Sequence, residues 1–243
     1  MNLLKSQNIY VINLDHRKDR LQMVDKQMNE KNIKYTRFSA IIPDMDEVKN
    51  NTLWKNSYQG LNWKKAKKWD CYVKGALGCK MSHYYIIKKA KDLDLDYVII
   101  LEDDFLFSEE ANEILKHNIF DNIDSNWDFI FLGGRLVGKK IKKVNNILSK
   151  VDSVITTIGY ILNKKTYDSA LKNLIKYNYE IDSIYSNLSL KKYYNNYMID
   201  PCLIYQTLEK SNITTRLTKD WVEEKDYELK NTLSNINDRF INI

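Results

Sequence analysis

A short apolar run that ends in three consecutive acids constrains this chain more than any other feature. The run is Tyr97–Leu101, and Glu102, Asp103 and Asp104 follow it directly. A short, β-branched and uninterrupted apolar run is typical of a strand that is buried on both faces. We therefore predict a central strand of an α/β sheet that carries three carboxylates at its carboxyl end.

The three adjacent acids need a compensating charge. Like charges held close together must be screened, protonated or bridged by a cation. A divalent ion such as Mg²⁺ binds carboxylate and substrate phosphate oxygens together, and open α/β sheets bind ligands beyond the carboxyl ends of their strands. The stretch predicts either a metal-assisted nucleotide-sugar site or a solvated acidic turn, and by itself it leaves both open.

The composition limits the class of protein. With 243 residues, 44% of them hydrophobic and 29% charged, the chain is long and apolar enough for a globular core. The net charge of +6 suits anionic ligands, but the basic residues are dispersed, so we expect no nucleic-acid partner. The three cysteines lack metal spacing and favour a reducing compartment. No signal peptide or transmembrane segment is expected, which predicts a cytoplasmic location.

The first forty residues predict a β-α-β unit. Asn8–Leu14 has the pattern of a strand, a helical pattern continues to about Asn32, and Tyr35–Ala40 has the pattern of a second strand. The turn between the first strand and the helix N-terminus is a natural anion site. Arg17 and Arg20 lie in this turn, where they either contact a nucleotide or are solvated.

The next stretch lacks a clear pattern until residue 75. Residues 41–70 predict a functional or exposed loop, and the basic residues between Trp63 and Trp69 are more typical of a solvated loop than of a base-stacking surface. Gly75–His83 then leads into a helix that ends near Leu93. A glycine at position 78 weakens a helix, so Gly78 predicts a close backbone approach. By its position, His83 is either a core histidine or a site residue.

The rest of the chain predicts alternating strands and helices in one domain, residues 1–243, with a core over 8–213 and a tail over 214–243. No repeat or linker divides it. The expected elements are strands at 127–132 and 154–162, a basic loop at 139–150, helices at 164–177 and from 180 to about 190, and a strand, proline break and strand at 197–206.

Several of these stretches share their residues and their order with one known family. They are Val11–Arg20, Gly75–His83, Val98–Asp104, Trp127–Gly133, Thr157–Leu162, Ile181–Asp182 and Pro201–Gln206. Together they resemble glycosyltransferase family 25, the lipooligosaccharide and procollagen galactosyltransferases, whose acidic motif also takes the form Leu-Glu-Asp-Asp. The resemblance is collinear from residue 8 to about 213, and it does not extend to residues 41–70.

The resemblance implies a fold and a reaction. The expected fold is α/β: a single GT-A-type nucleotide-sugar-binding domain with a mixed, mostly parallel central sheet flanked by helices. The expected reaction is the inverting transfer of galactose or glucose from a UDP-sugar, with Mn²⁺ or Mg²⁺, to a glycan or hydroxylysine-type acceptor. The family includes bacterial and viral members, and a viral origin would place the protein in the host cytoplasm or the virion.

The resemblance also implies roles for particular residues. Asp104 would bind the metal ion together with Asp103 and Glu102, and Asp182 would be the base that takes the acceptor proton, although a helix-capping role for Asp182 stays open. The expected donor-binding residues are Asn13, Arg17, Arg20, Gly75, Ser82, His83, Glu102 and Asp103.

Other functions remain open at this point. The same acids could serve a metal-dependent nucleotidyl or phosphoryl transferase, although the chain lacks a Walker-type glycine loop. A catalytically weak or inactive module of this fold could bind a nucleotide or glycan without turnover. The sequence does not identify the sugar, the acceptor or the oligomeric state, and a homo-oligomer is compatible with it.

Overall fold

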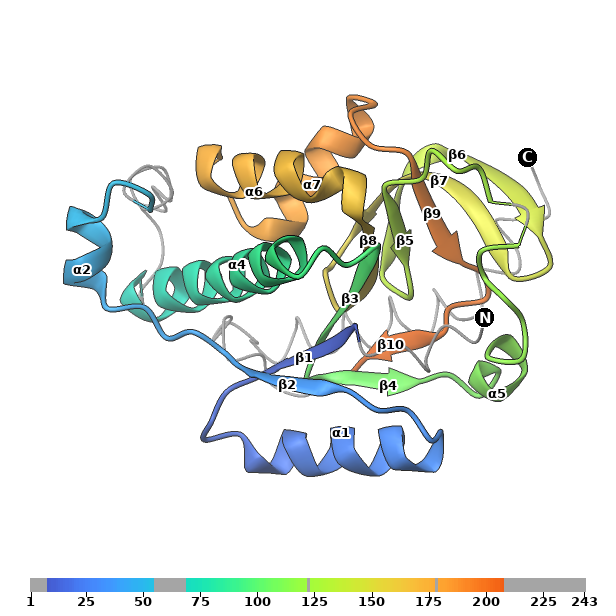
Figure 1. Ribbon diagram of the computed structural model, residues 1–243, viewed down its shortest axis with the longest axis horizontal. Coiled ribbons are helices and arrows are strands. Elements are labelled where there is room, and N and C mark those ends of the chain that lie inside the picture. Colours follow the sequence, from blue (N-terminus) through green and yellow to red (C-terminus); the bar gives the residue numbers. More distant parts are fainter. Residues whose placement is uncertain (1–7, 55–68, 122, 178, 208–243) are drawn as a thin grey trace, which may run out of the picture.

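The computed structural model describes residues 8–54, 69–121, 123–177 and 179–207, and these form an α/β arrangement (Figure 1). In chain order, the elements are β1 (Ile9–Asn13), α1 (Lys18–Glu30), β2 (Thr36–Ser39), α2 (Met45–Asn50), α4 (Trp69–Asp92), β3 (Tyr97–Glu102), β4 (Phe105–Phe107), α5 (Ala111–Ile114), β5 (Phe129–Phe131), β6 (Arg135–Asn145), β7 (Leu148–Ile155), β8 (Gly159–Asn163), α6 (Tyr167–Lys176), α7 (Ile181–Leu190), β9 (Asn196–Ile199) and β10 (Ile204–Gln206).

The large sheet has eight strands in the order β2-β1-β3-β8-β5-β9-β7-β6. The pairs β1–β2, β1–β3 and β5–β9 are parallel, whereas β3–β8, β5–β8, β7–β9 and β6–β7 are antiparallel. The predicted mixed sheet with flanking helices is therefore confirmed, with more antiparallel pairing than expected. A second, two-stranded sheet joins β4 to β10.

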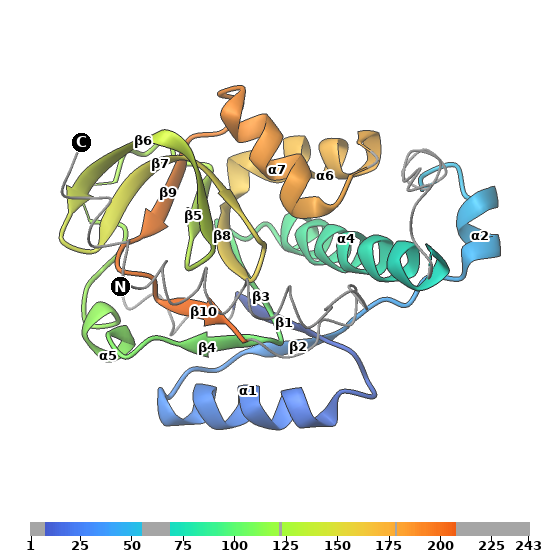
Figure 2. The ribbon, with the colours of Figure 1, turned by 180° about the vertical axis from the view of Figure 1, so that it is seen from behind.

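Strand β3 is buried on both faces, as its apolar run predicts. Ile99 and Leu101 point into one apolar cluster with Val24 and Met28 of α1. Val98 and Ile100 point into the other cluster, which receives side chains from α4, α6 and α7. Figures 1 and 2 show the same layers, with α1 on one side of the central strands and α4, α6 and α7 on the other.

The sequence prediction is wrong in one region. We expected a loop over 139–150, but β6 and β7 form an antiparallel hairpin there, with β6 at the edge of the sheet. Edge strands commonly carry lysines that discourage pairing with other chains, and the exposed Lys142 and Lys143 in β6 fit this pattern. The strand expected over 154–162 is divided between β7 and β8, and Thr156 has a φ of +81° between them.

The helix predicted around Gly75–His83 is α4, which starts earlier than expected, at Trp69. Residues 55–68 of the expected loop and the whole of the expected tail, 214–243, lie outside the described residues. Within the described part of the chain, no helix combines the length and apolar character needed to cross a bilayer.

The close approach predicted at Gly78 is confirmed. A Cβ atom at this position would lie 2.2 Å from the carbonyl oxygen of Ile41. The hydroxyl of Ser82, one turn further along α4, donates to the Gly78 carbonyl at 2.7 Å and accepts from the Ile41 backbone N–H at 2.9 Å. This contact fixes the chain that leaves β2 against α4, the helix that carries His83.

We predict that Gly78→Ala destabilises the protein more than Ser82→Ala does. The added methyl group meets a backbone oxygen that cannot rotate away, so the cost should exceed about 2 kcal/mol. Ser82→Ala removes hydrogen bonds at the same contact and should cost about 1–2 kcal/mol. Urea unfolding of both variants checks the order, and equal midpoints for Gly78→Ala and the unmodified protein would contradict the contact.

Candidate active site

The predicted acids gather at the carboxyl end of β3. Glu102 ends β3, Asp104 lies in the turn to β4, and Asp182 lies in the first turn of α7. Since the charge of Glu102 raises the pKa of both Asp104 and Asp182, the three carboxylates share one electrostatic environment. We call Glu102, Asp104 and Asp182 the acidic site.

Asp103 has a different environment from its neighbours. Its Oδ1 accepts a hydrogen bond from Arg20 Nη1 at 2.8 Å, and its Oδ2 accepts one from Asn13 Nδ2 at 2.7 Å. Both partners are buried, so Asp103 belongs to a buried polar network that joins β1, α1 and the β3–β4 turn. With both oxygens engaged, Asp103 does not fit the metal-ligand role that the sequence suggested for it.

The residues expected around the nucleotide are largely engaged with the protein itself. Arg20 is buried against Asp103. The Asn13 side chain also donates to the Arg17 carbonyl at 3.1 Å and accepts from Arg37 Nε at 2.9 Å. The Arg17 guanidinium pairs with Asp19 at 2.6 Å, which leaves Arg17 near the surface of the turn while Arg20 supports its interior.

Asp104 is buried with one free oxygen. Its Oδ2 accepts from Gln206 Nε2 at 3.0 Å, and Thr207 donates its backbone N–H to the Asp104 carbonyl at 2.7 Å. Its Oδ1 is buried and has no hydrogen-bond partner. Burial first, and then the charge of Glu102, raise the pKa of Asp104 to about 6. A carboxylate in this state is stabilised by a cation.

Glu102 remains ionised more easily than its burial suggests. Burial raises its pKa, but His83, the Thr157 hydroxyl and Arg20 outweigh that effect, so the pKa of Glu102 lies below its ordinary value. Thr157 Oγ1 donates to Glu102 Oε1 at 2.6 Å, and His83 Nε2 lies 3.5 Å from the same oxygen. Glu102 is thus an anion held between two polar side chains.

Asp182 has the features of a base at a helix N-terminus. Burial, followed by the nearby charges of Glu102 and Glu180, raises its pKa, while backbone N–H groups of Ser183 and Thr156 act against this rise. The Ser183 N–H lies 2.7 Å from Asp182 Oδ1. The helix-terminus role and the base role are therefore compatible in this geometry. A positive φ is costly for a β-branched residue, and Thr156 adopts one where it contacts Asp182.

His83 is buried in contact with the acidic site. Its Nδ1 is 2.9 Å from the hydroxyl of Tyr160, and its Nε2 is buried without a hydrogen-bond partner. Ligand atoms of Cys79, His83 and Glu102 lie within 4.8 Å of one another, and among the described residues this is the one trio of such groups that converges closely enough for a metal ion. Glu102, Asp103 and Asp104 do not converge in this way.

The side chains of the acidic site differ in how well they suit a hard divalent ion. Such ions prefer oxygen ligands, and the free Oδ1 of Asp104 is the atom that best fits one. Glu102 supplies a second ionised carboxylate in the same environment. Cys79 fits poorly, because burial and then the charges of Glu102, Asp182 and Asp104 raise the pKa of its thiol well above the ordinary value. By their chemistry, Asp104 and Glu102 therefore suit such an ion better than the Cys79 thiol does.

Two of the predicted donor-site residues have positions that favour a supporting role. Ser82 is fully buried in its contact with Ile41, as described above, and Gly75 is half-buried within α4. The structure brings His83 to the acidic site from the same helix. No described contact links Ser82 or Gly75 directly to the acids.

Sequence reasoning missed Lys80, a buried residue of α4 that contacts the segment leading into α7. Its ammonium group is buried and donates to the carbonyl oxygens of Tyr177 and Tyr179, each at 3.0 Å. Burial lowers the pKa of Lys80 to about 8. Lys80 thereby ties α4 to the segment that leads into α7, which carries Asp182. Its position four residues after Ala76, on the apolar face of the helix, was a signal that could have identified it.

Comparison with known proteins connects this geometry to a family. The family described as "Glycosyltransferase family 25 (LPS biosynthesis protein)" matches residues 6–185, which is most of the chain. The chain belongs to glycosyltransferase family 25. The family and the glycosyltransferase class predicted from the sequence are confirmed, and the UDP-sugar donor, the metal ion and the inverting mechanism stay predictions.

Individual relatives of this family 25 chain come from animals and bacteria. Procollagen galactosyltransferase 2 of Homo sapiens is 27% identical over 168 residues, which cover 64% of this chain and 26% of the human protein. Lipooligosaccharide biosynthesis protein lic2B of Haemophilus influenzae is 25% identical over 166 residues, which cover 64% of this chain and 59% of that protein. The match thus spans about a quarter of the length of the human relative.

A solved structure also resembles the fold of this family 25 chain. It is a glycosyltransferase involved in the glycosylation of the major capsid of PBCV-1, with a TM-score of 0.45 and 9% identity, covering 83% of this chain and 94% of the other. This likeness is too distant to support an inference about the site.

We predict that neutralising Asp104 stabilises the folded protein, whereas neutralising the adjacent Asp103 destabilises it. The pKa of Asp104 in the folded state, about 6, exceeds the unfolded value near 4, so ionisation destabilises the fold as pH rises through this interval. Asp104→Asn should therefore stabilise the metal-free protein at pH 7.5 by about 1–3 kcal/mol and have little effect at pH 4. Asp103→Asn should cost about 3 kcal/mol, because it leaves Arg20 buried without its counter-ion.

Thermal unfolding in the presence of a chelator checks both variants. A lower melting temperature for Asp104→Asn at pH 7.5 would contradict a buried carboxylate whose pKa is raised. A neutral effect of Asp103→Asn would contradict the buried ion pair with Arg20.

Proposed function

We propose that this chain is a metal-dependent, inverting hexosyltransferase that moves galactose or glucose from a UDP-sugar to a hydroxyl group of a glycan or of a protein-linked acceptor. One observation carries the proposal: the acidic site holds a buried carboxylate, that of Asp104, and a half-buried one, that of Asp182, with different surroundings. Asp104 has a free oxygen suited to a cation, and Asp182 has a raised pKa suited to a proton acceptor. The family supplies the class of reaction.

Asp104 and Glu102 are the residues that would hold the divalent ion. When bound, such an ion neutralises the charge that develops on the leaving diphosphate. The buried network of Arg20, Asp103 and Asn13 fixes the turn in which Asp104 lies. The hydrogen bond from Gln206 to Asp104 Oδ2 orients the Asp104 carboxylate and leaves Oδ1 unpaired.

Asp182 acts on the acceptor in this proposal. The acceptor oxygen forms a bond to the anomeric carbon, the bond from that carbon to the diphosphate oxygen breaks, and the hydroxyl proton passes to the Asp182 carboxylate. The attack comes from the face opposite the leaving group, which inverts the configuration. A base is more effective when its pKa is closer to the working pH, and burial beside Glu102 shifts the pKa of Asp182 in that direction.

The names of the relatives favour galactose among the donors. The human relative is named a procollagen galactosyltransferase and the Haemophilus relative a lipooligosaccharide biosynthesis protein. Their acceptors differ, so we propose only the shared chemistry for this chain, which is a hydroxyl group on a larger glycan or protein. Galactose and glucose differ in one hydroxyl orientation, a distinction that one or two hydrogen bonds can make.

A panel of donors tests the proposed function. UDP-galactose, UDP-glucose, UDP-N-acetylglucosamine, GDP-mannose and ATP would each be added with and without Mn²⁺, and thermal shift and nucleotide release would be recorded. We expect metal-dependent stabilisation and slow UDP release with one UDP-hexose. No response to any UDP compound would contradict the proposal and favour a binding module, whereas turnover of ATP would favour a phosphoryl transferase.

We predict that Asp182→Asn separates chemistry from donor binding. Loss of the general base should lower transfer about 10²–10⁴-fold, while the metal-dependent thermal shift with the UDP-sugar stays close to that of the unmodified protein. Asp168→Asn is a matched control, because Asp168 is an exposed acid in the first turn of the neighbouring helix α6. Full transfer activity in Asp182→Asn would exclude this residue as the base.

A further inference from the structure

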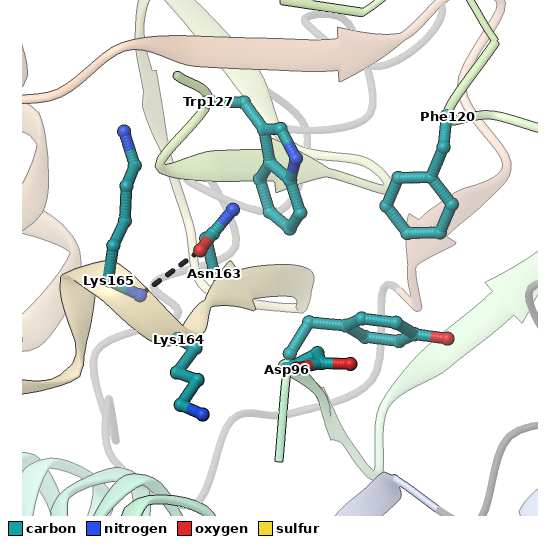
Figure 3. Close-up of a pocket in the computed structure, with 7 residues that line it drawn as sticks. Asp96, Phe120, Trp127, Asn163, Lys164 and Lys165 are labelled. Atoms are coloured by element: carbon teal, nitrogen blue, oxygen red, sulfur yellow. Dashed lines mark hydrogen bonds between the residues drawn. The ribbon is translucent and has the colours of Figure 1, made fainter. Parts of the chain in front are cut away.

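A cavity lies at the end of β3 opposite to the acidic site. It has a volume of about 580 Å³ and is lined by Asp96, Tyr97, Phe120, Trp127, Asn163, Lys164 and Lys165 (Figure 3). This volume is within the range of small-molecule pockets, roughly 300–1,000 Å³. Because Tyr97 starts β3 and Glu102 ends it, the two sites are separated by about 17 Å of extended strand. The mechanism proposed above does not use this cavity.

Aromatic side chains form one wall of the cavity. The ring centroids of Tyr97 and Phe120 are 5.3 Å apart, and those of Phe120 and Trp127 are 5.7 Å apart, with tilts of 48° and 38°. The rings thus contact one another in a row. Trp127 is only 7% exposed, so the more exposed Tyr97 and Phe120 provide most of the apolar surface. A continuous apolar wall of this kind suits a flat ligand with an apolar face.

Polar groups without partners surround the aromatic wall. Among the described residues, no hydrogen bond or ion pair involves the Asp96 carboxylate, the Trp127 indole N–H or the Asn163 Nδ2 group. Asn163 uses only its Oδ1, which accepts from the Lys165 backbone N–H at 3.1 Å. Figure 3 shows Trp127, Phe120, Asn163 and Asp96 around the same space. The cavity therefore offers two donors and an acceptor beside apolar rings.

The charges at the rim disfavour ionic ligands. Lys164 pairs with Asp94 at 2.8 Å, and Lys165 contacts the Asn126 carbonyl at 2.8 Å and Asp128 at 3.3 Å. These ammonium groups are already engaged, and the Asp96 carboxylate, whose charge also acts on Lys164, repels an anion. A cationic ligand would meet both lysines, and rings in mutual contact cannot enclose an ammonium group as an aromatic cage does. A neutral ligand rich in hydroxyl groups fits these conditions.

We propose that this cavity binds a neutral pyranose unit of a glycan, at a site separate from the acidic site. The C–H face of the sugar ring packs on Tyr97 and Phe120, and its hydroxyl groups bond to Asp96, Asn163 and the Trp127 indole N–H. Such a site holds a second part of a long glycan, or a glycan-bearing partner, while the acidic site is free to act. The proposal rests on the cavity itself and does not require the proposed donor or metal ion.

Nuclear magnetic resonance of the Trp127 indole tests the proposal without donor or metal. The resonance would be assigned with Trp127→Phe, and methyl β-D-galactopyranoside and methyl β-D-glucopyranoside would each be titrated into the intact chain. We expect the indole N–H signal to shift saturably with at least one glycoside. Asp96→Ala should weaken this binding about tenfold or more, because a charged acceptor is lost.

Matched variants separate this site from the acidic site. Asp92→Ala removes an exposed carboxylate just upstream, which pairs with Lys88 across one helix turn, and should bind the glycoside normally. Asn163→Asp keeps the Oδ1 acceptor for Lys165 but removes the Nδ2 donor, and should weaken binding. Asp182→Asn should bind at this cavity normally, so a failure of the proposed catalytic function would leave this result unchanged.

Three results would overturn the proposal. The first is an indole signal that neither glycoside shifts. The second is equal weakening by Asp92→Ala and Asp96→Ala. The third is weakened glycoside binding in Asp182→Asn, which would place the glycoside at the acidic site.

Discussion

The buried contact of Asp103 with Arg20 and Asn13 is the interaction on which the arrangement of the site depends. Arg20 comes from α1, Asn13 from the end of β1, and Asp103 from the turn after β3. A buried ion pair contributes little net stability, because desolvation offsets the attraction, but breaking it by removing one partner is costly. The network therefore acts mainly as a constraint on geometry. It engages the middle acid of the Glu102–Asp104 run in structure and leaves the outer two for the proposed metal site.

This division explains how three adjacent carboxylates can lie close together in the chain. Asp103 is neutralised by a guanidinium, and Glu102 is held by His83 and Thr157. Burial raises the pKa of Asp104 despite the hydrogen bond from Gln206 and the Arg20 charge, whose Nη1 lies 3.9 Å from Asp104 Oδ2. Each acid points to different partners, because Glu102 ends β3 whereas Asp103 and Asp104 lie in the turn that follows it. The sequence predicts repulsion among these acids, and three separate environments reduce it. Of the three, the environment of Asp104 is the one that suits an external cation.

Periodicity and turn residues in the sequence predicted the strands and helices that depend on neighbouring residues, but not the contacts between distant residues. The apolar run of β3, the opening β-α-β unit and the helix that begins at Ile181 follow from periodicity and turn residues. The β6–β7 hairpin was missed because an edge strand with lysines lacks an apolar pattern. The pairing of Asp103 with Arg20 joins residues 83 positions apart, and no spacing rule indicates which of three acids finds the arginine. The same holds for Lys80 and its two carbonyl partners.

The hydrogen bonds that Gln206 and Thr207 donate to Asp104 link the acidic site to the end of strand β10. Gln206 and Thr207 hold the Asp104 side chain and carbonyl, and β10 reaches them only after pairing with β4. A shortened protein that ended before Ile204 would keep every strand of the large sheet, and yet it would lose both restraints on the acid with the free oxygen. Such a protein could fold and still lack a defined site, so folding and competence for catalysis have different minimum lengths in this chain.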